Sequence, residues 1–338
     1  WFLPTTPGSR FVTLGGAVAN DVHGKNHHSA GTFGASVTRL GLRRSDSEPQ
    51  TLERGDPLFH ATIGGLGLTG VIEWVEFQAV RVPSAYLDAE DISFANVNDY
   101  FELMKERGAS FEHTMAWIDC LAGGDQLGRG VLSLANWSEK GGLKAHREDP
   151  RLAVPFNAPG FALNTASVKA FNTAYNALKK TREGASHPHY EPFLYPLDSI
   201  ANWNRMYGSK GFFQYQSVIP PDAAQDVTVD MLQAIAASGQ GSFLAVVKTF
   251  GSAEPVGLLS FPMEGVTLAL DFPNKGETTQ NLMRRLDDIV TAAGGRLYPA
   301  KDGRISAETF KAGYPQWEGF NQFVDPVLSS GFWRRVTQ

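Results

Sequence analysis

The densest group of chemically versatile side chains lies in one short stretch, residues 15–31, with the sequence GGAVANDVHGKNHHSAG. It holds four glycines, one aspartate, one lysine and three histidines. Gly15 and Gly16 permit a sharp turn or a close approach of the backbone to a ligand, because glycine has no Cβ. Burying so many polar groups is costly unless they bind something. The stretch therefore predicts a ligand-binding or catalytic segment, with a polar surface loop as the alternative.

Three other kinds of site are not predicted. Residues 65–70, GLGLTG, satisfy the G-x-G-x-x-G pattern of dinucleotide-binding loops. That pattern needs a helix directly after it, whereas residues 71–77, VIEWVEF, have the composition of a strand. His23 and His27 stand four residues apart, but no helix signal or carboxylate set accompanies them, so no metal site is expected. The hydrolase motifs G-x-S-x-G and H-E-x-x-H are absent.

Several separated motifs resemble, in the same order, those of the vanillyl-alcohol-oxidase (PCMH-type) FAD oxidoreductases. The motifs are HGKNHHSAG at 23–31, GLTG at 67–70, PLD…WNRMYG between 196 and 208, QYQSVIP at 214–220, RLYPAKDGR at 296–304 and AETF at 307–310. The resemblance covers nearly the whole chain. It implies an α+β fold of two domains, one binding FAD and one binding substrate, the latter with an antiparallel sheet flanked by helices.

The resemblance also implies a reaction. Its nearest branch oxidises the 2′-hydroxyl of a polyprenylphosphoryl-ribose by hydride transfer to N5 of a non-covalently held FAD. This chain would then be a bacterial FAD-dependent oxidoreductase of CH–OH groups in cell-wall biosynthesis, acting on a lipid-linked or free sugar beside an NAD(P)-dependent reductase. Two alternatives stay open. One is an aldonolactone or alditol oxidase of the same fold, and the other is a flavin-free fragment that acts only as a binding module.

Three side chains are the candidates for catalysis. By the resemblance, Lys301 places a cation where negative charge builds on the reduced flavin; its alternative is a surface lysine. His23 is suited to accept or relay the hydroxyl proton, and Lys25 to bind a phosphate or sugar hydroxyl. The expected cofactor contacts are Gly8, Thr13, Leu14, Gly15, Gly16, Asn20, His23, Gly70, Ile72, Tyr298 and Lys301. The expected substrate contacts are Lys25, Gln214, Gln216, Lys248 and Tyr314.

Strand alternation and cysteine usage add two expectations. Gln214 and Gln216 flank Tyr215 on a strand, so both amides point to one face, either toward the flavin or toward solvent. Ala269 stands where mycobacterial members of the family carry a cysteine, so inhibitors that trap that thiol are not expected to act on this chain. The single cysteine, Cys120, excludes an internal disulfide and a cysteine zinc site.

The composition limits the kinds of partner that the protein is expected to bind. The 338 residues are 42% hydrophobic, enough for a substantial core, and the net charge of −5 without a basic cluster gives no reason to expect nucleic acid. No apolar run reaches the roughly 18 residues that a membrane span needs. A lipid-linked substrate would still bring the protein to a membrane surface, as a peripheral contact in the cytoplasm or periplasm.

The remaining pattern predicts the elements that hold these residues. Helices are expected at 96–108, 167–180, 222–238 and 278–293, and strands at 11–14, 71–77, 113–119, 131–136, 212–219, 243–248 and 266–272. Together they suggest an antiparallel sheet with helices on one face. The polar stretch 138–165 is long for a loop, and the resemblance makes it a lid over the substrate.

The resemblance divides the chain into three segments. Residues 1–84 would complete the FAD-binding domain, 85–295 would form the substrate domain, and 296–338 would return to the FAD domain. The active site is then expected in the cleft between the domains. The family also places a glycine-rich loop for the FAD pyrophosphate ahead of the residue that is first here, Trp1, so that segment is expected to be missing from this sequence.

Overall fold

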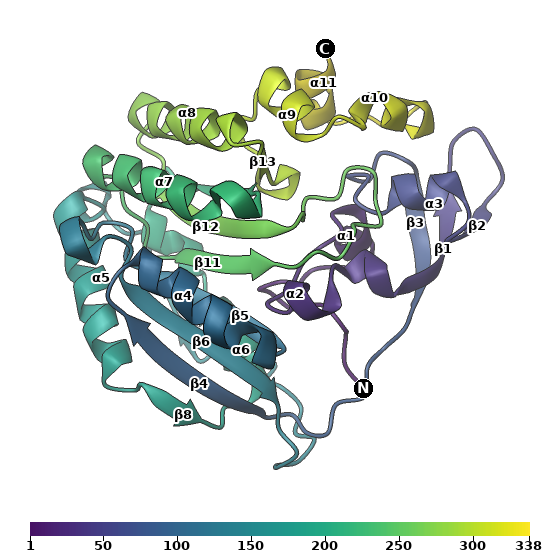
Figure 1. Cartoon of the computed structure of the whole chain (residues 1–338). Helices are drawn as coiled ribbons and strands as arrows, with labels where there is room; N and C mark the ends of the chain where they lie inside the picture. The colour runs from purple at the N-terminus through teal and green to yellow at the C-terminus, as the bar shows by residue number, and fades with distance from the viewer.

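A computed structural model describes the backbone of residues 1–338 and every side chain except that of Phe161. The described residues form one large sheet of eight strands, paired antiparallel in the order β13-β10-β12-β11-β5-β6-β4-β8 (Figure 1). Its strands are β4 (Leu87–Phe94), β5 (His113–Ile118), β6 (Gly130–Trp137), β8 (Gly184–Ser186), β10 (Phe212–Ile219), β11 (Ala245–Phe250), β12 (Gly265–Pro273) and β13 (Arg296–Leu297).

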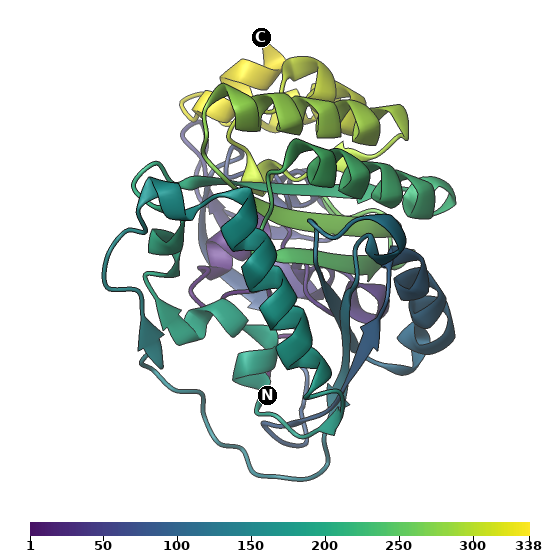
Figure 2. The ribbon, with the colours of Figure 1, turned by 90° about the vertical axis from the view of Figure 1, so that its left-hand side faces the viewer.

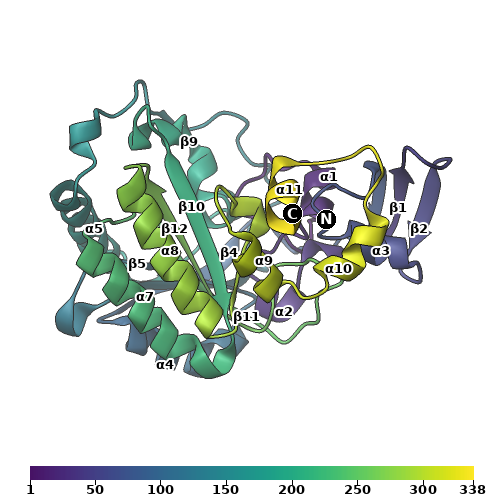
Figure 3. The ribbon, with the colours of Figure 1, turned by 90° about the horizontal axis from the view of Figure 1, so that it is seen from above.

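Three helices cover one face of this sheet: α4 (Val97–Arg107), α7 (Ala224–Ser238) and α8 (Glu277–Ala292). Their buried residues, such as Tyr100, Met231 and Leu286, share one core cluster with strand residues including Leu134 and Leu268. Seen from above, α7 and α8 lie side by side over the sheet, and α8 runs beside β10 (Figure 3). Burial of this continuous apolar surface is the main source of stability that the fold offers.

The opposite face of the sheet is covered unevenly. Helix α5 (Thr165–Lys180) packs there, because its Tyr175 ring lies 4.7 Å from Trp117, whose side chain points away from the core residues Ala116 and Ile118. Figure 2 shows α5 at the front of the molecule. The expectation of helices on one face only is therefore wrong for α5. The part of this face that α5 leaves open carries the candidate site.

A smaller unit is built from the first 80 residues. Strands β2 (Gln50–Glu53), β1 (Val37–Arg43) and β3 (Val71–Phe77) pair antiparallel in that order, and α1 (Leu14–Ala19), α2 (His27–Ala30) and α3 (Pro57–Thr62) accompany them. They enclose a core cluster of their own, with Val18, Leu40 and Phe59 fully buried. Figure 1 shows this unit beside the ends of strands β11 and β12, where α2 contacts β11.

The C-terminal segment contacts both units. Strand β13 extends the large sheet, and α9 (Ala307–Gly313), α10 (Trp317–Phe320) and α11 (Gly331–Thr337) follow it. Ser45 of the small unit donates to Asp325 through its backbone amide and its hydroxyl, each at 2.7 Å. Arg44 donates to the Phe323 carbonyl oxygen at 2.8 Å. These contacts fix the small unit relative to the tail.

The long polar stretch 138–165 holds little regular structure. Its short strand β7 (Leu152–Ala153) pairs in parallel with β9 (Ile200–Ala201), and α6 (Tyr190–Leu194) lies just before β9 in the chain. Ala158 and Arg205 are joined by a backbone hydrogen bond of 2.8 Å. The stretch is thus tied to residues 196–207, which approach the candidate site. Within the described part of the chain, every helix is too short or too polar to cross a membrane.

The strongly periodic elements agree with the sequence predictions, and one short element does not. Strand β10 has the predicted bounds, and the four predicted helices appear as α4, α5, α7 and α8 within two residues of their expected ends. Residues 65–70 are followed by strand β3, as predicted for a loop that is not a dinucleotide site. The strand predicted at 11–14 is wrong: Thr13 caps α1 and its Oγ1 accepts from the Gly16 amide at 3.1 Å.

Candidate functional site

A cavity of about 430 Å³ lies where the small unit, the open face of the large sheet and the loop after β13 meet. The first 25 residues, the strands β10, β11 and β12, and the segment 298–301 all contribute side chains to it. Its described lining residues are Thr6, Pro7, Gly8, Val12, Gly16, Asn20, Val22, His23, Gly24, Lys25, Met115, Pro196, Leu197, Gln214, Gln216, Leu244, Val246, Lys248, Ala269, Asp271, Tyr298, Ala300 and Lys301.

Strand register assembles the floor of the cavity. Gln216 is paired with Ala269, and Gln214 with Asp271, across β10 and β12. Lys248 on β11 is paired with Thr267, two residues before Ala269. Because alternate residues of a strand share a face, these side chains all point to the side away from α7 and α8. The sheet therefore delivers two amides, a lysine and a carboxyl group into one cavity.

His23 is held between two of these side chains. Its Nε2 lies 2.9 Å from the Gln216 amide nitrogen and its Nδ1 lies 3.3 Å from Lys248 Nζ. An imidazole that accepts from an amide at Nε2 carries its proton on Nδ1, where an uncharged Lys248 can accept it. Burial, and then the charge of Lys248, lower the pKa of His23 well below its ordinary value. His23 is therefore a neutral base at neutral pH.

Three lysines give the cavity a cationic character. Lys25 donates from Nζ to the Leu194 carbonyl oxygen at 2.8 Å. Burial lowers the pKa of Lys25 to about 8, with Asp198 opposing the shift. Burial and the nearby charges of Lys25 and Lys301 lower the pKa of Lys248 to about 7. None of the charges of the described groups that act on Lys248 is negative, so an anionic ligand would stabilise its charged form.

The third lysine and a tyrosine come from the short turn after β13. Lys301 donates from Nζ to Gln214 Oε1 at 3.0 Å, and burial lowers its pKa. The Tyr298 ring stacks on Phe261 with centroids 4.4 Å apart, and its backbone amide donates to the Gln216 carbonyl oxygen at 2.9 Å. This backbone bond fixes the turn to β10 and so sets where Lys301 enters the cavity.

The structure brings most of the predicted site residues together. Those that line the cavity are Gly8, Gly16, Asn20, His23, Lys25, Gln214, Gln216, Lys248, Tyr298 and Lys301. Five expected cofactor contacts lie outside its lining: Thr13, Leu14, Gly15, Gly70 and Ile72. Thr13 caps α1, and Ile72 packs in the core of the small unit. Their predicted contacts with a cofactor remain untested predictions.

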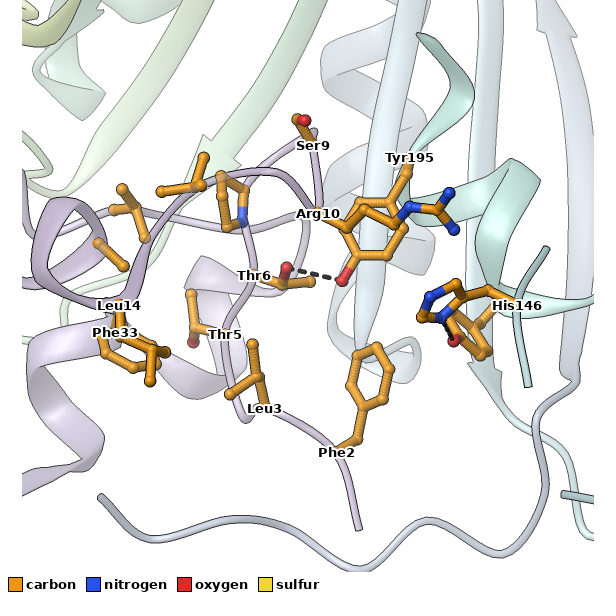
Figure 4. A pocket seen from close by; sticks show the side chains of 15 residues that line it. Phe2, Leu3, Thr5, Thr6, Ser9, Arg10, Leu14, Phe33, His146 and Tyr195 are labelled. Carbon is orange, nitrogen blue, oxygen red and sulfur yellow. Dashed lines mark hydrogen bonds between the residues drawn. The ribbon is translucent and has the colours of Figure 1, made fainter. Parts of the chain in front are cut away.

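A second cavity of about 210 Å³ adjoins the first and receives one of these residues, Leu14 (Figure 4). It is mostly apolar, with the Phe2 and Phe33 rings among its walls. The hydroxyl groups of Thr6 and Tyr195 share a hydrogen bond of 2.8 Å at its edge. Thr6, Pro7, Val12 and Val22 line both cavities, so the segment of residues 6–12 is the partition between them.

Tyr314 is a correction to the predicted site. It is 2% exposed, its ring stacks on Phe310, and its hydroxyl donates to the Leu297 carbonyl oxygen at 2.8 Å. It therefore packs the C-terminal helices against β13 and does not cap the cavity. A single tyrosine in a tail of irregular pattern carries no periodicity from which its direction could be read.

Asp271 is the lining residue of greatest chemical interest that the sequence analysis missed. Among the described side chains that line the cavity, it is the one carboxyl group. Burial raises the pKa of Asp271 to about 6, against the hydrogen bond from Gln214 and the charge of Lys301. The signal was available, because Asp271 is two residues from Ala269 on a predicted strand and so must share its face.

Replacing Ala269 by cysteine is expected to create a reactive thiol in the cavity. The natural Cys120 is fully buried, and burial raises the pKa of its thiol to about 12, so the unmodified chain should resist aromatic disulfide reagents. Ala269→Cys should react at least about 100-fold faster than the parent. A matched control is Ala116→Cys, buried on the opposite face of the sheet. Equal rates for the two variants would contradict the placement of Ala269.

Among the described residues, no group of three or more His, Cys, Asp or Glu side chains is arranged to hold a metal ion. His28 Nε2 is instead 2.8 Å from the Phe111 carbonyl oxygen, and the His27 ring lies 4.4 Å from that of Phe250. The histidines that follow His23 in the sequence therefore pack against β11 and the loop before β5.

Comparison with known proteins gives the class. No protein-family model matches the chain. Over 352 residues it is 34% identical to the decaprenylphosphoryl-beta-D-ribose oxidase of Mycolicibacterium smegmatis, covering 99% of this chain and 76% of that protein. Over 356 residues it is 30% identical to a protein of Streptomyces coelicolor described as uncharacterized and lying in the mprA 5′ region, covering 99% of this chain and 96% of that protein.

The match to the oxidase covers 99% of this chain, and so includes the cavity-forming strands and the stretch around His23; the chain is an oxidoreductase. More particularly, it belongs to the family of decaprenylphosphoryl-β-D-ribose oxidase. The resemblance inferred from the separated motifs is confirmed by this match.

Proposed function

We propose that the protein is an FAD-dependent oxidoreductase that oxidises the 2′-hydroxyl of a polyprenylphosphoryl-ribose to a ketone. The observation that carries the proposal is the convergence of His23, Lys25, Lys248 and Lys301 with two glutamines in one cavity. A neutral base can accept the hydroxyl proton, amides can hydrogen-bond the sugar, and cations can bind a phosphate. The name of the mycobacterial relative supports the substrate class.

The residues present fit a flavin. Gly8 lines the cavity, and a Cβ built on it would meet nothing within 4 Å. The backbone at Gly8 is therefore open to a ligand. Tyr298 adds a ring at the wall, and Lys301 adds a buried amine. When bound, FAD supplies the hydride acceptor, N5 of its ring system. Lys301 would hold the edge that gains negative charge, and Gly8 and Gly16 would admit the ring to the backbone.

The side chains around the sugar have distinct tasks in this proposal. When the substrate hydroxyl replaces the Gln216 amide at His23 Nε2, His23 takes the hydroxyl proton there, and the proton on Nδ1 can pass to Lys248 Nζ, which lies 3.3 Å away. The N–H of Gln216 that this exchange releases, and the second N–H of the Gln214 amide, donate to sugar oxygens, while the other N–H of Gln216 stays on Thr267 Oγ1. The Lys25 side chain, whose Nζ donates to the Leu194 carbonyl oxygen, can turn toward a phosphate. Burial strengthens each of these electrostatic contacts because water is excluded.

The same proposal assigns a ligand to each segment of the chain. Residues 1–84 and 296–338 would hold FAD, and 85–295 would hold the sugar, with the cavity between them as the reaction site. A polyprenyl substrate would draw the protein to a membrane surface. The ketone product suits an NAD(P)-dependent reductase as the next enzyme, because a keto group is that class of enzyme's substrate.

An absorbance spectrum followed by anaerobic substrate addition tests the proposal. Purified protein supplied with FAD should show a band at about 450 nm, and a polyprenylphosphoryl-ribose should bleach it. A band that bleaches only with a free aldonolactone or alditol would favour an oxidase of that type. A protein that takes up no flavin would overturn the proposal and favour a binding module.

A further inference from the structure

Asp271 and Gln214 are direct partners across β10 and β12, and both line the candidate site. Opposed residues in an antiparallel pair have Cβ atoms only about 4.5–5.5 Å apart. Asp271 is 4% exposed, so its carboxyl group must find donors inside the protein. The Tyr207 hydroxyl donates to Oδ2 at 3.4 Å, which is a long bond for a buried carboxylate.

Gln214 supplies the better partner. Its Oε1 accepts from Lys301 Nζ at 3.0 Å, which leaves the NH₂ of the same amide to donate. A hydrogen bond from the Gln214 side chain indeed lowers the pKa of Asp271, against the larger effect of burial, which raises it. The Gln214 amide therefore lies between Asp271 and Lys301: its NH₂ donates to the Asp271 carboxyl group, and its Oε1 accepts from the Lys301 amine.

The charges of the neighbouring groups support the same arrangement of Asp271, Gln214 and Lys301. Burial lowers the pKa of Lys301, and among the described groups the charge of Asp271 is what opposes that shift. The Lys248 amine also faces the cavity, where its positive charge repels that of Lys301 instead of balancing it. Without Asp271, the three cavity lysines would face one another with no carboxylate at the lining.

We propose that Asp271 is a positioning residue: acting through the Gln214 amide, it fixes the place of Lys301 Nζ and keeps that group cationic. The proposal deepens the proposed function, because a fixed cation at this point matters for a flavin substrate-oxidation site. Asp271 itself touches neither reactant. Its role is to orient an amide that can face only one way while the carboxylate is present.

The test measures the protonation of Lys301 directly and needs no flavin. The full chain is exposed to trace acetic anhydride between pH 6 and pH 11, and the extent of acetylation at Lys301 is read by mass spectrometry against the exposed Lys180. Asp271→Asn removes the charge and keeps the shape. We expect the Lys301 signal near neutral pH to rise about tenfold, because one unit of pKa is a tenfold change in free amine.

A matched control is Asp119→Asn. Asp119 is a fully buried aspartate paired with Arg129 at the far end of β5, so its loss should destabilise the fold without moving the Lys301 profile. An unchanged Lys301 profile in a folded Asp271→Asn protein overturns the proposal. If that variant does not fold, Gln214→Ala carries the test, with the same shift expected and an unchanged profile again overturning it.

The flavin-loaded protein gives a second reading. Asp271→Asn should lower kcat about tenfold and leave KM within about twofold, because it touches the cation rather than the sugar. A rise in KM alone would place Asp271 on the substrate and overturn the positioning role. If the parent protein takes up no flavin, the proposed function fails while the acetylation result still stands by itself.

Discussion

Replacing Lys301 by alanine is expected to slow reduction of the bound flavin by about 100- to 1,000-fold. Removing one preorganised group that meets developing charge commonly costs this much. Lys301 is well placed for such a role, because its Nζ is held at 3.0 Å by Gln214 Oε1 and its turn is anchored to β10 through Tyr298. Little reorganisation is then needed as negative charge appears.

The measurement is stopped-flow absorbance at about 450 nm after anaerobic mixing with the polyprenylphosphoryl-ribose. Flavin content is determined first, so that lost binding is not mistaken for slow chemistry. Lys275→Ala, which removes an exposed lysine outside the cavity, serves as the control and should leave the rate unchanged. A Lys301→Ala protein that keeps its flavin and reduces it at the parent rate would show that this cation is dispensable.

The fold was most predictable where a pattern repeats over many residues. The helix at 97–107 begins after Asn96, whose side chain accepts from the amides of Asn98 and Asp99, so its cap was visible in the sequence. Helix α1 was missed because its six residues are too short to show an apolar period. Phe11 and Val12 suggested a strand, yet both are exposed at the entry to that helix.

The residues of the site could be predicted from the sequence, but the contacts among them could not. Alternation along β10 correctly put Gln214 and Gln216 on one face, and the motif around His23 indicated a polar site. The pairing of Gln214 with Asp271 depends on which strands are neighbours and in which register, and a single sequence does not state either. The contact between His23 and Lys248 joins residues 225 positions apart, so it follows only from the tertiary fold.

Folding stability is expected to rise between pH 7 and pH 9, and Lys248→Met is expected to remove much of that rise. Burial lowers the pKa of Lys25 to about 8 and that of Lys248 to about 7, while both amines titrate near 10.5 in the unfolded chain. Between these values the unfolded chain binds protons that the folded protein has released. The two lysines therefore make stability increase with pH in this window, and their contribution levels off below about pH 7.

The expected gain is about 3–4 kcal/mol from pH 7 to pH 9, since each unit of pKa difference is worth about 1.4 kcal/mol, Lys248 titrates below nearly the whole window and Lys25 below its upper half. Above about pH 10.5, where the lysines of the unfolded chain have also lost their protons, the trend should reverse. Burial raises the pKa of Tyr100 and Tyr298, so the unfolded chain loses tyrosine protons first, and folding becomes less favourable as pH rises further.

Urea unfolding followed by tryptophan fluorescence at pH 7, 8 and 9 measures this dependence. Lys248→Met keeps the length of the side chain and removes its charge, so it should stabilise the protein at pH 7 by about 2 kcal/mol and flatten the slope. Lys180→Met, at an exposed position, should change neither. A slope that survives Lys248→Met would place the titrating groups elsewhere. Lys248 is one of the cavity amines whose charged form an anionic ligand would stabilise. The stabilised variant should therefore also bind the anionic substrate more weakly, which would show that the cavity keeps a destabilising lysine for the sake of its ligand.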